Sequence, residues 1–173
     1  SPGVGGACLS KDPHILIELS KKAGYYPKLI AEARRINEVY PSLIVKRIEE
    51  TLKKVGKELN KANILIAGFA FKGNPETADM RDSTTLSLLR EFKSRPSCVI
   101  KGYDPIVEET EIKKLGVETV TLSDGFNMLD VLIIANNHES YKDWYIPDLV
   151  SKMNKPAIIY DGWRMLDKEI IES

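Results

Sequence analysis

The sequence predicts an α/β protein: a helical segment followed by a doubly wound, Rossmann-like parallel sheet. In residues 13–60, apolar positions recur three and four residues apart, which is the period of an amphipathic helix. From Lys61 onward, short continuous apolar runs alternate with helical stretches. Such runs suit strands that are covered on both faces, and right-handed crossovers between parallel strands give a doubly wound sheet.

The composition limits the possible partners. Apolar residues make up 43% of the 173 residues, which is typical of a globular protein. Lys plus Arg and Asp plus Glu number 25 each, so no excess of positive charge points to nucleic acid. No apolar run is long enough to span a membrane, and two cysteines do not form a disulfide framework. We expect a cytoplasmic protein with no nucleic-acid or membrane partner.

The first expected helix begins at Pro13. Asp12 is a suitable N-cap, and proline at the first helical position loses no hydrogen bond. Gly24 is expected to end this helix, and residues 29–39 carry the apolar face of a second one.

A third helical stretch follows Pro41, which can start or kink a helix. Its apolar residues form a coiled-coil-like seam at alternating steps of three and four. The seam consists of Val45, Ile48, Leu52, Val55 and Leu59. We expect a homodimer through the helix at residues 43–60; the alternative is that the seam packs on its own domain.

The remainder of the chain alternates between the two element types. Strands are expected within residues 63–71, 98–105, 117–122, 131–136 and 157–162. Helices are expected within residues 83–94, 108–116, 126–130 and 147–153. Parallel open sheets bind ligands at the carboxyl ends of their strands. The candidate binding loops are therefore residues 71–83, 103–105, 136–141 and 161–164.

Cys8 stands out on chemical grounds. It follows Gly5 and Gly6, which permit close approach of a substrate, and it precedes an expected helix N-terminus, whose partial positive charge stabilises a thiolate. Lys11 adds positive charge nearby. Asp12 suits either a helix cap or an acid–base role. The residues alone leave a nucleophilic Cys8 and a structural thiol equally open.

Other motifs fail. Residues 3–8 lack the third glycine of a dinucleotide fingerprint, and residues 68–75 lack the Lys and Ser/Thr of a P-loop. His14 and His138 have no cysteine at metal-ligand spacing, so we expect no metal and interpret both as surface or satisfied polar residues. Cys98 lies in a strand-like run and suits an inert core position.

Four stretches together resemble one enzyme family. They are GVGGACLSKD at residues 3–12, ARRINEVYP at 33–41, GFAFKGNPETADMRDS at 68–83 and YDGWRML at 160–166. In this order and spacing they resemble the UDP-glucose/GDP-mannose dehydrogenase family. Members oxidise the C6 alcohol of a nucleotide sugar to a carboxylate with NAD.

The resemblance implies roles for particular residues. Cys8 would capture the aldehyde as a thiohemiacetal that becomes a thioester, Asp12 would assist water or proton transfer, and Lys11 would lie near NAD. Gly5, Gly6, Phe71, Lys72 and Arg164 would contact the substrate. The favoured substrate is UDP-N-acetylmannosamine, with UDP-glucose next.

The resemblance also implies a division into domains. Residues 1–60 would belong to a central helical dimerisation domain that carries the cysteine turn, and residues 61–173 would form the C-terminal UDP-binding domain. The family's N-terminal NAD-binding domain is absent from this sequence, so we expect the chain alone to be inactive. The alternative is a non-catalytic nucleotide-sugar binding or dimerisation module.

Overall fold

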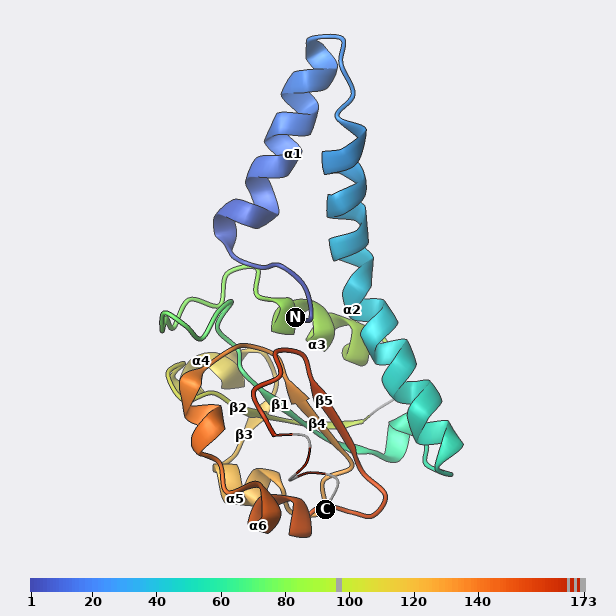
Figure 1. Cartoon of the computed structure of the whole chain (residues 1–173), viewed down its shortest axis with the longest axis vertical. Helices are drawn as coiled ribbons and strands as arrows, with labels where there is room; N and C mark the ends of the chain where they lie inside the picture. Colours follow the sequence, from blue (N-terminus) through green and yellow to red (C-terminus); the bar gives the residue numbers. More distant parts are fainter. Residues whose placement is uncertain (96–97, 168, 170, 172–173) are drawn as a thin grey trace.

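The computed structural model describes residues 1–95, 98–167, 169 and 171. It shows a parallel sheet covered by helices, with a long helical hairpin that projects away from it (Figure 1). The α-helices are α1 (Ala7–Lys22), α2 (Lys28–Lys54), α3 (Thr84–Lys93), α4 (Glu109–Lys114), α5 (Leu122–Gly125) and α6 (Ile146–Ser151). The strands are β1 (Asn63–Ala67), β2 (Val99–Tyr103), β3 (Glu118–Thr119), β4 (Val131–Ile134) and β5 (Ile158–Asp161). Two 3-10 turns, η1 (Leu59–Lys61) and η2 (Glu139–Asp143), complete the described elements.

The strand order is β3-β2-β1-β4-β5, and every neighbouring pair is parallel. The chain starts in the middle at β1, moves to one edge through β2 and β3, and then crosses to β4 and β5. The point where the order reverses lies between β1 and β4. This arrangement confirms the predicted doubly wound α/β fold.

Alternate residues of the central strands enter two separate cores. Ile64 and Ile66 of β1 pack with α2 and α3 on one face. Leu65 of β1 and Leu132 of β4 pack with η2 and α6 on the other face. Both strands are buried on both sides, which explains why the sequence shows continuous apolar runs instead of alternation.

Helix α2 corrects two predictions. Residues 28–54 form one continuous helix that contains Pro41, rather than two helices separated there. The predicted seam is not free for a subunit interface, because most of it is buried in the core on the sheet. Val45, Ile48, Leu52 and Leu59 are between 0% and 6% exposed. The alternative, packing on its own domain, is what the structure shows, and the seam cannot support the predicted homodimer.

Helix α1 begins earlier than predicted, at Ala7 with Gly6 as its N-cap. Pro13 therefore lies inside the helix, where it has no N–H to donate to the Leu9 carbonyl. Arg34 of α2 donates from Nη1 to that carbonyl at 3.3 Å and so replaces the missing hydrogen bond. Asp12 is consequently not the cap of this helix.

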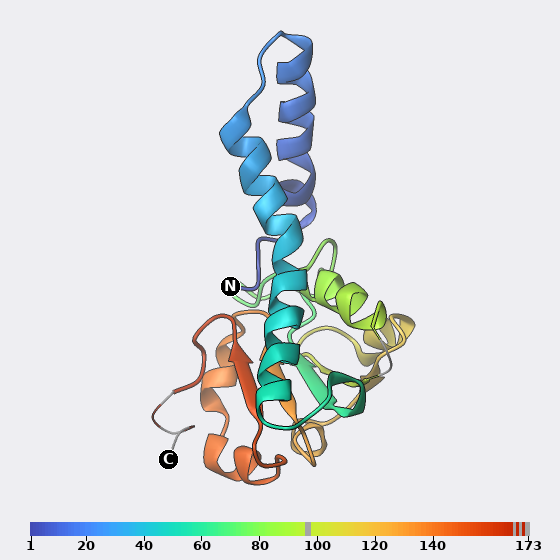
Figure 2. The ribbon, with the colours of Figure 1, turned by 90° about the vertical axis from the view of Figure 1, so that its right-hand side faces the viewer.

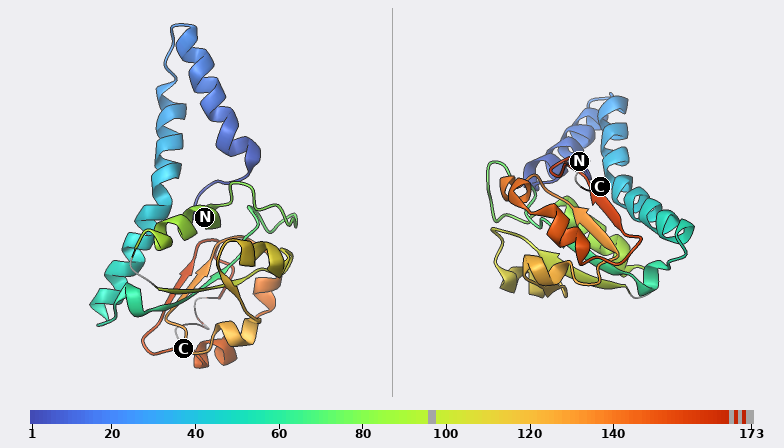
Figure 3. Two further views of the ribbon diagram at one scale, coloured as in Figure 1. Left: turned by 180° about the vertical axis from the view of Figure 1, so that it is seen from behind. Right: turned by 60° about the horizontal axis from the view of Figure 1, so that its bottom comes forward.

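The first half of α2 pairs with α1 as the hairpin, and Figure 2 and Figure 3 show its tip far from the sheet. Large apolar side chains on it are exposed, among them Leu19, Leu29 and Ile36. Among the described helices, none combines the length and apolarity that a membrane crossing requires.

Candidate functional site

The N-terminal segment crosses the carboxyl end of the sheet. The Asn37 side chain of α2 fixes it by donating to the Val4 carbonyl at 2.9 Å and accepting from the Val4 N–H at 2.7 Å. Pro2 is buried close to Gly162, which follows β5: a Cβ on Gly162 would lie 2.8 Å from the proline Cδ. The segment that leads to Cys8 is therefore held against the predicted ligand-binding edge.

Gly5 and Gly6 bring this segment into contact with the loop that follows β1. The Gly6 N–H donates to the Asp82 carbonyl at 3.1 Å. A Cβ on Gly5 would lie 2.5 Å from the same carbonyl oxygen, and one on Gly6, whose φ is +97°, would lie 3.0 Å from the Phe71 ring. Both positions need glycine, and three predicted site residues, Gly5, Gly6 and Phe71, lie together.

Cys8 is exposed in the first turn of α1, where unpaired backbone N–H groups give the helix end a partial positive charge. The Lys11 Nζ and the Asp12 carboxylate lie 3.7 Å apart on the same helix, and both side chains are more than half exposed. Behind the turn lies a polar cavity of about 140 Å³ with Ser10 and Asp82 in its lining.

Arg81 is a basic residue near Cys8 that the sequence interpretation missed. Its guanidinium hydrogen-bonds both carboxylate oxygens of Asp79 at 2.7–3.0 Å. These bonds raise the pKa of Arg81, and a smaller charge interaction with Cys8 acts in the same direction. The same hydrogen bonds lower the pKa of Asp79. Its position in the quoted ADMRDS stretch was the available signal.

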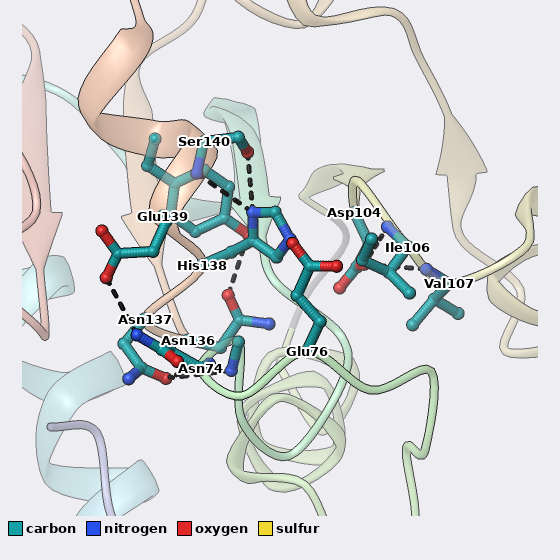
Figure 4. Close-up of polar contacts among 12 residues, drawn as sticks. Asn74, Glu76, Asp104, Ile106, Val107, Asn136, Asn137, His138, Glu139 and Ser140 are labelled. Carbon is teal, nitrogen blue, oxygen red and sulfur yellow. Dashed lines mark hydrogen bonds and ion pairs between the residues drawn. The ribbon is translucent and has the colours of Figure 1, made fainter.

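Asp104, at the end of β2, organises two loops with one carboxylate. One oxygen accepts from the backbone N–H groups of Phe69 at 2.6 Å and Ala70 at 3.2 Å. The other accepts from those of Ile106 and Val107, each at 2.9 Å (Figure 4). The carboxylate thus shapes the backbone just before Phe71.

Asn136, at the end of β4, lies against the same backbone. Its Oδ1 accepts from the buried Tyr141 hydroxyl at 2.9 Å, and its Nδ2 donates to the Ala70 carbonyl at 3.4 Å. Gly68 has a φ of +103° and allows this approach, because a Cβ there would lie 2.6 Å from the Asn136 Cγ. Burial raises the pKa of Tyr141 well above its ordinary value, so the hydroxyl stays a donor.

Lys72 lies over the Phe71 ring, with 5.5 Å from Nζ to the ring centroid. In the part of the chain that the structure describes, no carboxylate is within ion-pair distance of Lys72. Its charge is thus available to an anionic ligand.

Arg164 is exposed in the loop after β5, with a φ of +56°. Its neighbour Trp163 donates from the indole to the Ala135 carbonyl at 3.0 Å. Over the described ranges, no hydrogen bond or ion pair joins Arg164 to Cys8, Phe71 or Lys72. The structure therefore places Arg164 at the predicted edge without a polar interaction that joins it to these other site residues.

No cluster of three or more His, Cys, Asp or Glu side chains suited to a metal ion occurs among residues 1–95, 98–167, 169 and 171. Cys98 is half-buried, and burial raises the pKa of its thiol.

Comparison with known proteins decides the family. The UDP-binding domain of the UDP-glucose/GDP-mannose dehydrogenase family matches residues 65–168, more than half of the chain. The chain belongs to this family. The central domain of the family also matches, over residues 1–39. The resemblance that the four sequence stretches indicated is therefore confirmed.

Two curated members of the UDP-glucose/GDP-mannose dehydrogenase family illustrate the likeness. The UDP-N-acetyl-D-mannosamine dehydrogenase of Pyrococcus horikoshii is 32% identical over 162 residues, covering 92% of this chain and 35% of the relative. The UDP-N-acetyl-D-glucosamine 6-dehydrogenase of Salmonella typhi is 28% identical over 162 residues, covering 92% of this chain and 37% of the relative. The chain thus spans little more than a third of the length of these relatives.

Solved structures of the family show the same fold. The UDP-D-ManNAc dehydrogenase of Pyrococcus horikoshii aligns with a TM-score of 0.79 at 30% identity, over 96% of this chain and 36% of that one. A UDP-glucose dehydrogenase of Pyrobaculum islandicum aligns with a TM-score of 0.77 at 25% identity, over 93% of this chain and 34% of that one.

Proposed function

We propose that this chain supplies the catalytic cysteine and the nucleotide-binding part of an NAD-dependent UDP-sugar 6-dehydrogenase. UDP-N-acetylmannosamine is the favoured substrate, in keeping with the similar Pyrococcus protein, and UDP-glucose is next. The observation that carries the proposal is the packing of the Gly6 turn on Phe71, because it puts the Cys8 turn beside the loop that bears Lys72. One substrate can then reach both.

The proposed roles follow from the chemistry of each side chain. The Lys72 ammonium complements the diphosphate, and the Phe71 ring packs on the uridine side. The Cys8 sulfur bonds to the C6 aldehyde carbon while the carbonyl oxygen takes a proton, which gives a thiohemiacetal. Oxidation of this adduct yields a thioester. Water attacks the thioester with help from Asp12, the C–S bond breaks, and the acid leaves.

When bound, NAD would supply the oxidising power for two oxidations, that of the C6 alcohol to the aldehyde and that of the thiohemiacetal to the thioester. We assign the contact with NAD to Lys11. Its ammonium is exposed and lies 3.7 Å from the Asp12 carboxylate. We expect no NADH from residues 1–173 alone with a nucleotide sugar, measured at 340 nm. The proposed domains, 1–60 and 61–173, agree in order with the two family matches.

UDP binding to the 173-residue chain tests the nucleotide site. We expect calorimetry to show at least about tenfold weaker UDP binding for Lys72→Met, because one ion pair with the diphosphate is lost. Lys22→Met, at the far end of α1, is the matched control and should bind like the parent. A parent that binds no UDP, or a Lys72→Met variant that binds equally well, contradicts the proposal.

Alkylation of the two cysteines tests the position of Cys8. UDP-N-acetylmannosamine should slow the reaction of Cys8 with iodoacetamide, while Cys98 in the same molecule provides the internal control. UDP alone, which lacks the sugar, should protect Cys8 less. Mass spectrometry measures the alkylation of each thiol. If the sugar nucleotide changes the alkylation rates of Cys8 and Cys98 equally, the sugar lies away from Cys8.

A further inference from the structure

His138 lies just after β4 and has no part in the chemistry proposed above. Its side chain is only 7% exposed. Nδ1 accepts a hydrogen bond from the Ser140 backbone N–H at 3.2 Å and lies 2.8 Å from the Ser140 Oγ. Because Nδ1 acts as an acceptor, the neutral ring carries its proton on Nε2.

The buried Nε2 points at Glu76, which comes from the loop after β1 (Figure 4). The distance from Nε2 to the Glu76 Oε1 is 3.1 Å. The contact is not aligned as a hydrogen bond, and within the described residues Nε2 has no other partner. With its proton on Nε2, the neutral ring therefore presents the positive end of an N–H dipole to the Glu76 carboxylate at short range.

The same two segments are joined at three further points. The Asn137 Oδ1 accepts from the backbone N–H groups of Gly73 at 2.9 Å and Asn74 at 3.3 Å. The Asn74 Nδ2 donates to the Glu139 Oε1 at 3.1 Å. A Cβ on Gly73 would lie too close to the His138 backbone nitrogen, so the two segments of the chain are in contact directly after Lys72.

We propose that His138 is a positioning residue for the nucleotide-binding loop: through Nε2 it holds Glu76 at the end of β4 and so fixes the backbone that carries Lys72. The inference rests on the proposed function, because it concerns the same UDP site. Asn137 fixes the start of the loop at Gly73, and His138 fixes it three residues later. Two attachment points restrict the direction of Lys72 more than one does.

Two isosteric variants separate this role from a purely structural one. His138→Asn keeps an acceptor near Nδ1 for the Ser140 N–H but has nothing at the position of Nε2. His138→Gln keeps a donor near Nε2 but loses the Ser140 contact. We expect UDP to bind about fivefold more weakly to His138→Asn and within about twofold of the parent to His138→Gln. If the hydrogen bond from the Ser140 N–H to Nδ1 is what matters, His138→Gln should instead bind UDP more weakly than His138→Asn.

A double-mutant cycle tests the partner. Glu76 is exposed in its loop, so Glu76→Ala should fold. Its UDP affinity should fall by the same factor as that of His138→Asn, and the affinity of the double variant should fall no further. Additive losses, or unchanged affinity in either single variant, overturn the inference. Circular dichroism melting curves report folding, and Glu76→Ala alone decides if His138→Asn does not fold. If the parent binds UDP and Lys72→Met weakens it, only this inference is at stake; a parent that binds no UDP overturns both.

Discussion

Aspartates organise both ends of the sheet, one at the amino end and two at the carboxyl end, but with different partners. At the amino end, Asp130 accepts from the Lys57 ammonium at 2.6 Å, the Asn63 backbone N–H at 2.9 Å and the Asn154 amide at 3.0 Å. Lys57 also donates to the Pro156 carbonyl at 2.6 Å. A buried carboxylate and a cation neutralise each other there.

At the carboxyl end, Asp104 and Asp161 accept from backbone N–H groups instead. Asp104 accepts from four, and Asp161 accepts from those of Trp163 at 3.0 Å and Leu166 at 2.8 Å. Neither Asp104 nor Asp161 uses a cation to shape its loop; Asp79 does pair with Arg81 there, but Lys72 forms no ion pair within the described residues. The comparison indicates that an unpaired positive charge, that of Lys72, distinguishes the proposed ligand-binding end of this sheet from the opposite end.

The largest effect is expected from Asp104→Ala, which leaves four backbone donors without their acceptor. We expect the free energy of unfolding to fall by about 4 kcal/mol, at about 1 kcal/mol for each lost bond. Asp161→Ala removes two such bonds and should cost about 2 kcal/mol. Urea denaturation measures both. Equal losses would show that the number of backbone bonds does not set the cost.

Lys57→Met tests the opposite end. It leaves the nearly buried Asp130 without its cation, so we expect a loss of about 3 kcal/mol in the free energy of unfolding. UDP affinity should stay within about twofold of the parent, because the change lies at the other end of the strands. A marked loss of UDP affinity in folded Lys57→Met would contradict the separation of the two ends.

The pH dependence of stability should depend on Asp130. Burial alone raises the pKa of Asp130, but hydrogen bonds from Lys57, the Asn63 N–H and Asn154 outweigh it, so the net pKa is lowered. A carboxyl group whose pKa is lowered in the folded state stabilises the fold above its unfolded pKa of about 3.9. This stabilisation is lost as the pH falls through the folded-state pKa. The parent should have a higher free energy of unfolding than Asp130→Asn at pH 7, and this difference should shrink below about pH 4. A constant difference in urea titrations would refute this.

The smallest effect is expected from Tyr141→Phe, which removes one hydroxyl that donates to Asn136. The free energy of unfolding should fall by about 1 kcal/mol, because the Asn136 oxygen loses a buried donor. UDP affinity should change by less than about twofold, since Asp104 still shapes the adjoining backbone. A larger loss of UDP affinity would show that Asn136, rather than Asp104, fixes the conformation of the binding loop.

The fold was predictable because its signals are local. The apolar runs of β1 and β4 and the periodic faces of α3 and α6 lie within single elements, and each was expected at its observed place. The packing of Gly6 on Phe71 was predictable only through the family motifs, since the two residues are far apart in the sequence.

The errors come from contacts between distant segments. The start of α1 was misplaced because Arg34, in another helix, compensates for Pro13. The seam from Val45 to Leu59 has the same spacing whether it faces a second subunit or its own sheet. His138 was interpreted as a surface or satisfied polar residue, because neither its burial nor the distance to Glu76 is visible in the spacing of residues.

Asn37 and Pro41 together give α2 a mechanical character. Pro41 has no N–H for the Asn37 carbonyl, so the helical ladder is interrupted at the residue whose side chain grips Val4. Beyond this point the helix is anchored in the core; before it, the rod of the hairpin stands clear of the sheet. We expect bending to concentrate at this level. A force on the distant hairpin tip would then tilt the hairpin about this level of α2, and the cysteine turn lies beside the bending point.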